Sequence, residues 1–153
     1  MGEASDPYIL YFSDGEEPIE PISLSFKQDG IITNPGHYEV KGDVDANWEL
    51  TFELDVTNTG DRSGEITCEK IILSEDIGDN YFCWGSCLSP NVNSNTITLE
   101  PGETERFSSH FMPMDENWEL KPGAELLVEY HFYEETSDEH YIYEVHYKYE
   151  VEE

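Results

Sequence analysis

The sequence predicts an all-β fold, an antiparallel β-sandwich of about eight or nine strands, with a small β-barrel as the alternative. Short segments of alternating apolar and polar residues recur along the chain, and turn-forming residues separate them. No segment has the roughly 3.6-residue period of an amphipathic helix. The length of 153 residues fits one domain, 1–153. Residues 1–40 are its least regular part.

The N-terminal part contains three weaker strand candidates. Tyr8–Phe12 and Ile22–Phe26 are rich in residues that favour strands, and the acidic segment DGEEPIEP separates them. His37–Lys41 fits an edge strand.

The clearest strand lies in WELTFELDVTN, where Trp48 and every second residue up to Val56 form one apolar face. It ends at residues 58–61, Asn-Thr-Gly-Asp, which favour a turn. Pro101-Gly102 and Pro122-Gly123 suit the centres of type II turns, each leading into a strand. The remaining expected strands are 65–74, 81–84, 96–99, 106–112, 124–133 and 140–151.

The charge is strongly negative. The chain has 35 Asp and Glu residues against 7 Lys and Arg, a net charge of -28. Direct nucleic-acid binding is disfavoured because phosphates are repelled. No apolar run reaches the roughly 20 residues of a membrane helix, so we expect no transmembrane segment. A solvated surface explains most of the charge, but an acidic surface also suits divalent cations or a basic partner.

The three cysteines bear on the compartment. Cys83 and Cys87 lie four residues apart across a glycine, where a disulfide can close; a metal-binding thiol pair and two free thiols are the alternatives. Cys68 alternates with Ile66 and is expected to be a free, buried thiol. A disulfide implies an oxidising compartment. No signal peptide is visible after Met1-Gly2, so either an export signal has been removed or the chain starts in the cytoplasm; the cysteine pair favours export.

The order of motifs after Trp48 resembles that of a known group. A strand ending in NTG leads to the loop Cys83-Trp84-Gly85-Ser86-Cys87, then to Pro101-Gly102-Glu103, a KPG turn and a final aromatic strand. This pattern resembles immunoglobulin-like β-sandwich domains of secreted and surface proteins of Bacteroidetes, over about 100 residues. The resemblance implies an extracellular, cell-surface or periplasmic location and an accessory, adhesion or ligand-binding role. Residues 1–40 do not match it.

No catalytic motif is visible. GxSxG, HExxH and glycine-rich phosphate loops are absent from the sequence. Paired carboxylates for glycoside hydrolysis are not testable from sequence, because their separation in space is not encoded locally. We therefore expect no enzyme, with a hydrolase of unknown substrate as a minor alternative.

Two places are candidates for a divalent metal such as calcium, although no cofactor is the primary expectation. Asp43 and Asp45 offer oxygen ligands at alternate positions, but Trp48 stands where an EF-hand needs glycine. The second place is the hairpin of 125–133 and 140–149, whose outward faces carry Glu129, His131, Glu144 and His146. If Glu129 faces Glu144, a metal, protonated histidines or a shifted register would relieve their repulsion.

Exposed aromatic residues are candidates for ligand binding, namely Trp84, Trp118 and Tyr133. For Trp84 the alternative is a place at one end of the core. The segment DANWEL at 45–50 recurs as DENWEL at 115–120. Because the sequences diverge after each copy, we interpret the repeat as coincidence, or as two similar strand-entry turns, and not as a duplicated domain.

These observations predict a non-catalytic, exported module for protein or carbohydrate interaction or adhesion. The alternative is a binding domain that depends on calcium or another divalent metal. The expected partner is a protein or a glycan.

Overall fold

The computed structural model describes residues 22–137 and 139–151. All secondary-structure elements in these ranges are strands, which confirms the all-β prediction, and no helix there could cross a membrane. The candidate strand Tyr8–Phe12 lies outside the described residues. The strands are β1 (Leu24–Gln28), β2 (Ile31–Ile32), β3 (Gly36–Gly42), β4 (Leu50–Asn58), β5 (Gly64–Glu75), β6 (Asp79–Trp84), β7 (Ser86–Cys87), β8 (Ser94–Leu99), β9 (Thr104–Met112), β10 (Glu125–Tyr133) and β11 (His140–Tyr149).

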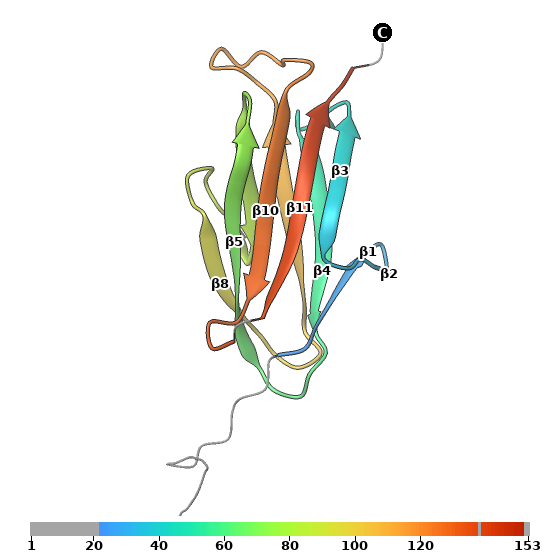
Figure 1. Ribbon diagram of the computed structural model, residues 1–153, viewed down its shortest axis with the longest axis vertical. Coiled ribbons are helices and arrows are strands. Elements are labelled where there is room, and N and C mark those ends of the chain that lie inside the picture. Colours follow the sequence, from blue (N-terminus) through green and yellow to red (C-terminus); the bar gives the residue numbers. More distant parts are fainter. Residues whose placement is uncertain (1–21, 138, 152–153) are drawn as a thin grey trace, which may run out of the picture.

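The strands form two sheets that pack face to face (Figure 1). One sheet has the order β2-β1-β4-β9-β6-β7, and the other has the order β3-β11-β10-β5-β8. Each sheet keeps two edges, so the fold is a sandwich and not a closed barrel. The predicted β-sandwich is therefore confirmed.

One strand pairing departs from the antiparallel prediction. β3 was expected as an edge strand and is one, but it runs parallel to β11, with His37 opposite Glu144 and Val40 opposite Tyr147. The chain leaves the other sheet after β2 and enters the edge beside β11 in the same direction as β11. Alternation of side chains carries no information on strand direction, so the sequence pattern did not reveal this.

The core lies between the two inner faces. On β4 the alternation places Leu50, Phe52, Leu54 and Val56 inside, as predicted. Trp48 does not continue this face: it precedes the strand and is 52% exposed, so its expected place on the apolar face was wrong. The other inner residues include Phe82, Phe107, Phe111, Tyr130, Phe132, Tyr143 and Tyr147.

The C-terminal hairpin has the register that was considered from sequence. Leu126 lies opposite Tyr147, Val128 opposite Val145, and Glu129 opposite Glu144. The inner side chains of both strands are buried. A shift of the register by one residue would turn them all to solvent, so their burial favours this register.

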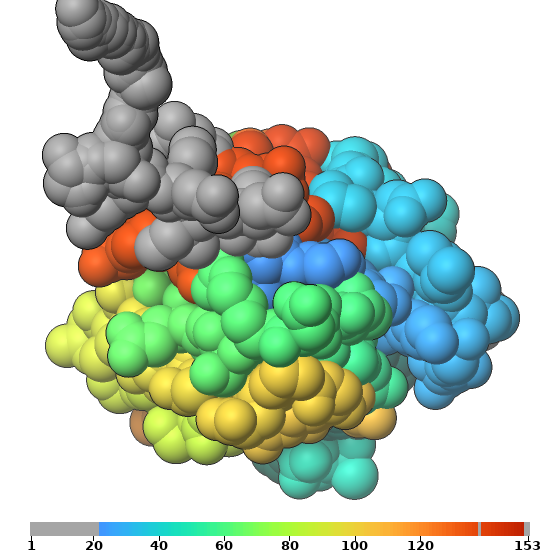
Figure 2. Space-filling view, turned by 90° about the horizontal axis from the view of Figure 1, so that it is seen from below, coloured from blue at the N-terminus to red at the C-terminus, as the bar shows by residue number. Residues whose placement is uncertain are grey.

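Connections gather at the two ends of the sandwich. At the lower end of Figure 1, shown from below in Figure 2, the turn after β4 lies against the turn before β9. The Gly102 amide donates to the Asn58 carbonyl over 2.8 Å, and Gly102 has the positive φ of 81° that a type II turn needs. At the opposite end, Leu50 of β4 pairs with Phe111 of β9. The segment entering β4 and the segment leaving β9 therefore emerge side by side.

Candidate functional site

The two DxNWEL segments form the same turn at this upper end. In the first, the Asp45 amide donates to the Glu49 carbonyl over 2.9 Å, and the Trp48 amide donates to the Asp45 carbonyl over 3.0 Å. In the second, Asp115, Glu119 and Trp118 make the same two bonds at the same lengths. The repeat is thus a pair of equivalent turns, as the second of our two interpretations expected.

The aspartate side chain holds each turn closed. Asp45 Oδ1 accepts from the amides of Asn47 and Glu49 over 2.8 and 3.2 Å. Asp115 Oδ1 accepts from the equivalent amides over 2.8 and 3.1 Å. These backbone hydrogen bonds, with Lys121 nearby, lower the pKa of Asp115.

Each turn displays a tryptophan in a strained conformation. Trp48 and Trp118 have φ values of 67° and 64°, which are rare for bulky residues. Their side chains are nevertheless 52% and 70% exposed, so burial of the indoles does little to compensate for the strain. The turns thus expose two indoles at one end of the sandwich, on a backbone whose conformation the local hydrogen bonds fix.

Replacing Trp118 by glycine is expected to raise the free energy of unfolding by about 0.5–1 kcal/mol. Glycine lacks a Cβ and adopts the left-handed conformation without the penalty of roughly 1–2 kcal/mol that other residues carry there, while the added freedom of the unfolded chain costs about 0.5–1 kcal/mol. Trp118→Ala keeps the strained φ and should change stability by less than about 0.5 kcal/mol. Urea unfolding of the three proteins measures this, and a clear loss for the glycine variant would show that the indole supports the fold.

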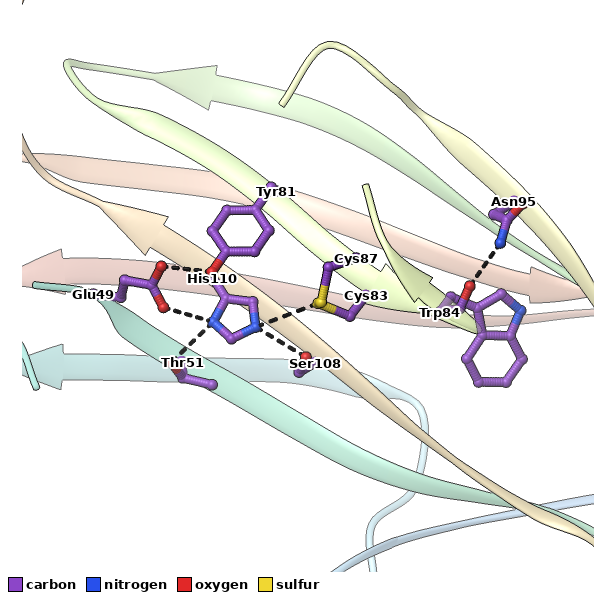
Figure 3. The surroundings of a disulfide bond; sticks show 9 residues. All are labelled: Glu49, Thr51, Tyr81, Cys83, Trp84, Cys87, Asn95, Ser108 and His110. Carbon is purple, nitrogen blue, oxygen red and sulfur yellow. Dashed lines mark hydrogen bonds and ion pairs between the residues drawn. A yellow bond between two sulfur atoms is a disulfide. The ribbon is translucent and has the colours of Figure 1, made fainter. Parts of the chain in front are cut away.

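A polar cluster on the outer sheet face anchors the first turn (Figure 3). Glu49, which follows Trp48, is 8% exposed. Its Oε2 accepts from the Tyr81 hydroxyl over 2.6 Å, and its Oε1 lies 3.0 Å from Nδ1 of His110. The Tyr81 ring stacks on the His110 ring with centroids 4.5 Å apart. Burial and the Glu49 carboxylate raise the pKa of Tyr81, so the hydroxyl remains a donor.

The cluster continues from His110 toward the disulfide. The Nδ1 atom of His110 must carry a proton to bond the carboxylate of Glu49. In the neutral ring, Nε2 of His110 therefore accepts a hydrogen bond from the Ser108 hydroxyl over 2.9 Å. Cys83 Sγ lies 3.9 Å from the same nitrogen. Sequence reasoning did not identify this cluster, because its members come from β6, β9 and the segment just before β4, and no local motif joins them.

The connectivity of Ser108, His110 and Glu49 is that of a hydrolytic triad, but its setting differs. Ser108 lies in β9, paired with Glu53 of β4 on one side and Cys83 of β6 on the other. The backbone amides around it belong to the sheet ladder, whereas an oxyanion hole needs free amides. We therefore interpret the cluster as a support for the Trp48 turn.

The disulfide Cys83–Cys87 is present, and Cys68 is a free, buried thiol, as expected. Cys83 pairs directly with Cys87 because β7 folds back at Gly85, which has φ of 79°. A Cβ at Gly85 would lie 2.5 Å from Ile97, so a larger residue would clash.

Of the two interpretations of Trp84, the structure supports the place in the core and contradicts the exposed ligand-binding residue. Trp84 is fully buried, and its Nε1 donates to the Ile66 carbonyl over 3.0 Å. Alternation along β6 explains this, because Phe82 and Trp84 point inward when Tyr81 and Cys83 point outward. Asn95 of β8 donates to the Trp84 carbonyl over 2.7 Å, also shown in Figure 3.

Trp118 borders a hollow of about 100 Å³. Two methionines and three carboxylates complete the lining, namely Met112, Met114, Asp79, Asp115 and Glu116. Asp115 is engaged by its turn and by Lys121 Nζ at 3.2 Å. Methionine, indole and acidic side chains thus meet in one place.

The four residues considered as metal ligands on the hairpin do not converge. Glu129 and Glu144 face each other, but each carboxylate has a different histidine partner. Glu129 Oε1 lies 2.9 Å from His131 Nε2, and Glu144 Oε1 lies 2.6 Å from His37 Nδ1. His146 Nε2 lies 2.8 Å from Glu125. Within the described ranges, no three His, Cys, Asp or Glu residues gather as a metal cluster.

The other candidate residues have local structural roles. Asp43 Oδ1 accepts from the Val44 amide, while Asp45 closes the first tryptophan turn. Tyr133 is half-buried, stacks on His140 with centroids 4.4 Å apart, and points its hydroxyl at Glu69 over 3.4 Å. Of the three aromatic candidates, Trp118 alone is largely exposed.

No protein-family model and no curated protein matches the sequence. Solved structures share the fold. The N-terminal domain of PorA superposes with a TM-score of 0.65 at 17% identity, covering 83% of this chain and 97% of that one. The CooA pilin subunit from enterotoxigenic Escherichia coli gives 0.53 at 13%, covering 87% and 100%. A family 123 glycoside hydrolase from Clostridium perfringens gives 0.52 at 8%, covering 86% and 28%. The two packed sheets and these fold neighbours define the chain as a β-sandwich domain.

Proposed function

We propose that this chain is a non-catalytic interaction module of an exported protein, and that its tryptophan-bearing end docks onto a basic face of a protein partner. The observation that carries the proposal is the pair of exposed, strained tryptophans on two equivalent turns at one end. Tryptophan is enriched among the residues that dominate binding energy at interfaces.

The rigidity of the turns supports a binding role. A bulky residue in the left-handed region costs about 1–3 kcal/mol and persists only where surrounding bonds enforce it. Here Asp45 and Asp115 enforce it, and Glu49 fastens one turn to the sheet. A turn whose backbone is already fixed loses little conformational entropy on binding.

The charge supports a basic partner. The net charge of -28 attracts cationic surfaces over long range. Beside Trp118, the carboxylates Asp79 and Glu116 lie where a lysine or arginine side chain would meet the indole and pair with an acid.

The compartment and the fold neighbours agree with this role. A disulfide is stable in an oxidising compartment, which supports a periplasmic, cell-surface or extracellular location. The neighbours include a pilin subunit and the N-terminal domain of PorA. The resemblance to Bacteroidetes surface domains supports the same role.

The test is a comparison of defined probes on arrays, with lysine- and arginine-containing peptides on one and neutral oligosaccharides on the other. We expect binding to basic peptides that weakens as salt rises. The double variant Trp48→Gly/Trp118→Gly should lose at least about 2 kcal/mol of binding energy, roughly 30-fold in affinity.

The control is Tyr133→Leu, which changes an aromatic residue on β10, outside both tryptophan turns, and should bind as the wild type does. Binding to oligosaccharides alone would replace the protein partner with a glycan. Binding abolished by chelation would favour a calcium-dependent domain, and binding that survives loss of both tryptophans would refute the proposed site.

A further inference from the structure

Two histidines meet on the outer face of the β3-β11-β10-β5-β8 sheet. His131 of β10 and His140 of β11 are diagonal neighbours, because His140 pairs with Tyr133, two residues along β10. Their Nδ1 atoms lie 3.5 Å apart, and the ring planes are nearly perpendicular, at 87°. A separation of 3.5 Å is long for a hydrogen bond between nitrogens.

Each ring is oriented by a separate contact. His131 Nε2 lies 2.9 Å from Glu129 Oε1, so the carboxylate holds the proton on Nε2 and leaves the Nδ1 lone pair free in the neutral ring. The ring of His140 stacks on Tyr133 at an angle of 7°. In metal sites, the histidine that binds the metal through one ring nitrogen often donates its other N–H to a carboxylate, and Glu129 is placed to accept in this way from His131.

The spacing fits two ligands of one metal ion. Zinc binds imidazole nitrogen at about 2.0–2.1 Å, so two nitrogens on a tetrahedral ion lie roughly 3.3–3.4 Å apart. The two Nδ1 atoms need to move by only a few tenths of an ångström to reach this separation.

We propose that His131 and His140 form an open, two-histidine site for a divalent transition-metal ion of the zinc and copper class, with Glu129 as the carboxylate that positions His131. Zinc and copper ions bind well to imidazole nitrogen, whereas calcium and magnesium favour oxygen ligands. The remaining coordination positions are open to water or to a donor from another molecule. This proposal does not depend on the role of the tryptophan end.

The surroundings favour a cation. Glu69 faces His131 from β5, and Glu129 accompanies it on β10. A proton and a metal ion compete for the same imidazole nitrogen, so metal binding should weaken in acid.

The test uses the metal ions alone, Cu²⁺ and Zn²⁺, with calorimetry and, for Cu²⁺, electron paramagnetic resonance. We expect one bound ion per chain, tighter for Cu²⁺ than for Zn²⁺, with nitrogen hyperfine structure from two imidazoles. His131→Ala and His140→Ala should each weaken binding at least about tenfold, and Glu129→Gln about 10- to 100-fold.

The matched controls are His37→Ala and His146→Ala, which remove histidines of the same sheet face that pair with Glu144 and Glu125. They should bind metal as the wild type does. Thermal unfolding without metal verifies that every variant is folded. Equal losses in the controls, or binding unchanged in His131→Ala and His140→Ala, would overturn the site.

Discussion

Replacing Trp84 by alanine is expected to lower the free energy of unfolding by about 3–5 kcal/mol. The indole is fully buried and packs edge to face against Phe132, with centroids 5.4 Å apart. Its loss leaves a large cavity and removes the donor to the buried Ile66 carbonyl. Because domains of this size have about 5–15 kcal/mol of stability, the variant should lose much of its own.

Denaturant unfolding measures this loss, and Trp118→Ala is the matched control, since it removes the same side chain from an exposed position. Trp84→Phe should fall between the two, because it fills part of the cavity but cannot donate. Similar stabilities for Trp84→Ala and Trp118→Ala would contradict the burial of Trp84 and return it to the list of ligand-binding candidates.

The second large effect concerns alkaline pH. The hydroxyls of Tyr130, Tyr143 and Tyr147 are buried in the core, and burial raises the pKa of all three. Ser109 Oγ lies 2.6 Å from the hydroxyls of Tyr130 and Tyr147, and Tyr143 donates to the Thr33 carbonyl. In the unfolded chain these tyrosines ionise near pH 10.

The sign follows from proton binding. Above about pH 10 the unfolded state holds fewer protons than the folded state, so stability falls as pH rises. Each of these tyrosines lowers the free energy of unfolding by about 1.4 kcal/mol per pH unit, so the three together lower it by about 4 kcal/mol per pH unit.

Burial lowers the pKa of Lys70 below its ordinary value of 10.5. Lys70 therefore makes stability rise with pH, but only at pH values below about 10.5. Burial also raises the pKa of the Cys68 thiol, which adds a smaller loss of stability that begins near the ordinary thiol pKa of 9.0. The steep fall from the tyrosines begins above about pH 10.

Unfolding free energies at about pH 9, 10 and 11, with tyrosinate absorbance, measure this dependence. The variant Tyr147→Phe should lower this slope by about 1.4 kcal/mol per pH unit while retaining the ring. A flat dependence above about pH 10 would show that solvent reaches these hydroxyls in the folded chain.

Where local patterns determine an element, the sequence was sufficient to predict it. Period-2 alternation placed β4, β10 and β11 and their inner faces, and the register of Glu129 opposite Glu144 was one of the arrangements that it allowed. The two Pro-Gly pairs marked the turns before β9 and β10, since glycine alone adopts their positive φ without strain. The disulfide followed from two cysteines four residues apart across a glycine.

Trp48, just before β4, and Trp84, at the end of β6, show the limit of such patterns. Trp48 matches the apolar face of β4 in sequence, yet the Asp45 turn holds it outside the strand in the left-handed region. Trp84 was expected both at the end of a strand and in the cysteine loop; because β7 folds back at Gly85, Trp84 belongs to β6 and points into the core. In both cases a tight turn decides which residue belongs to the strand.

The sequence by itself determined the all-β class, most strand positions, the inner residues and the cysteine pair, because each depends on neighbours within a few positions. Tertiary structure alone decided that β3 runs parallel to β11, that Glu49, Tyr81 and His110 meet, and that His131 finds His140. It also brought the two tryptophan turns to one end, through the pairing of β4 with β9. These arrangements depend on which strands become neighbours, which is settled by burial of whole sheet faces rather than by local pattern.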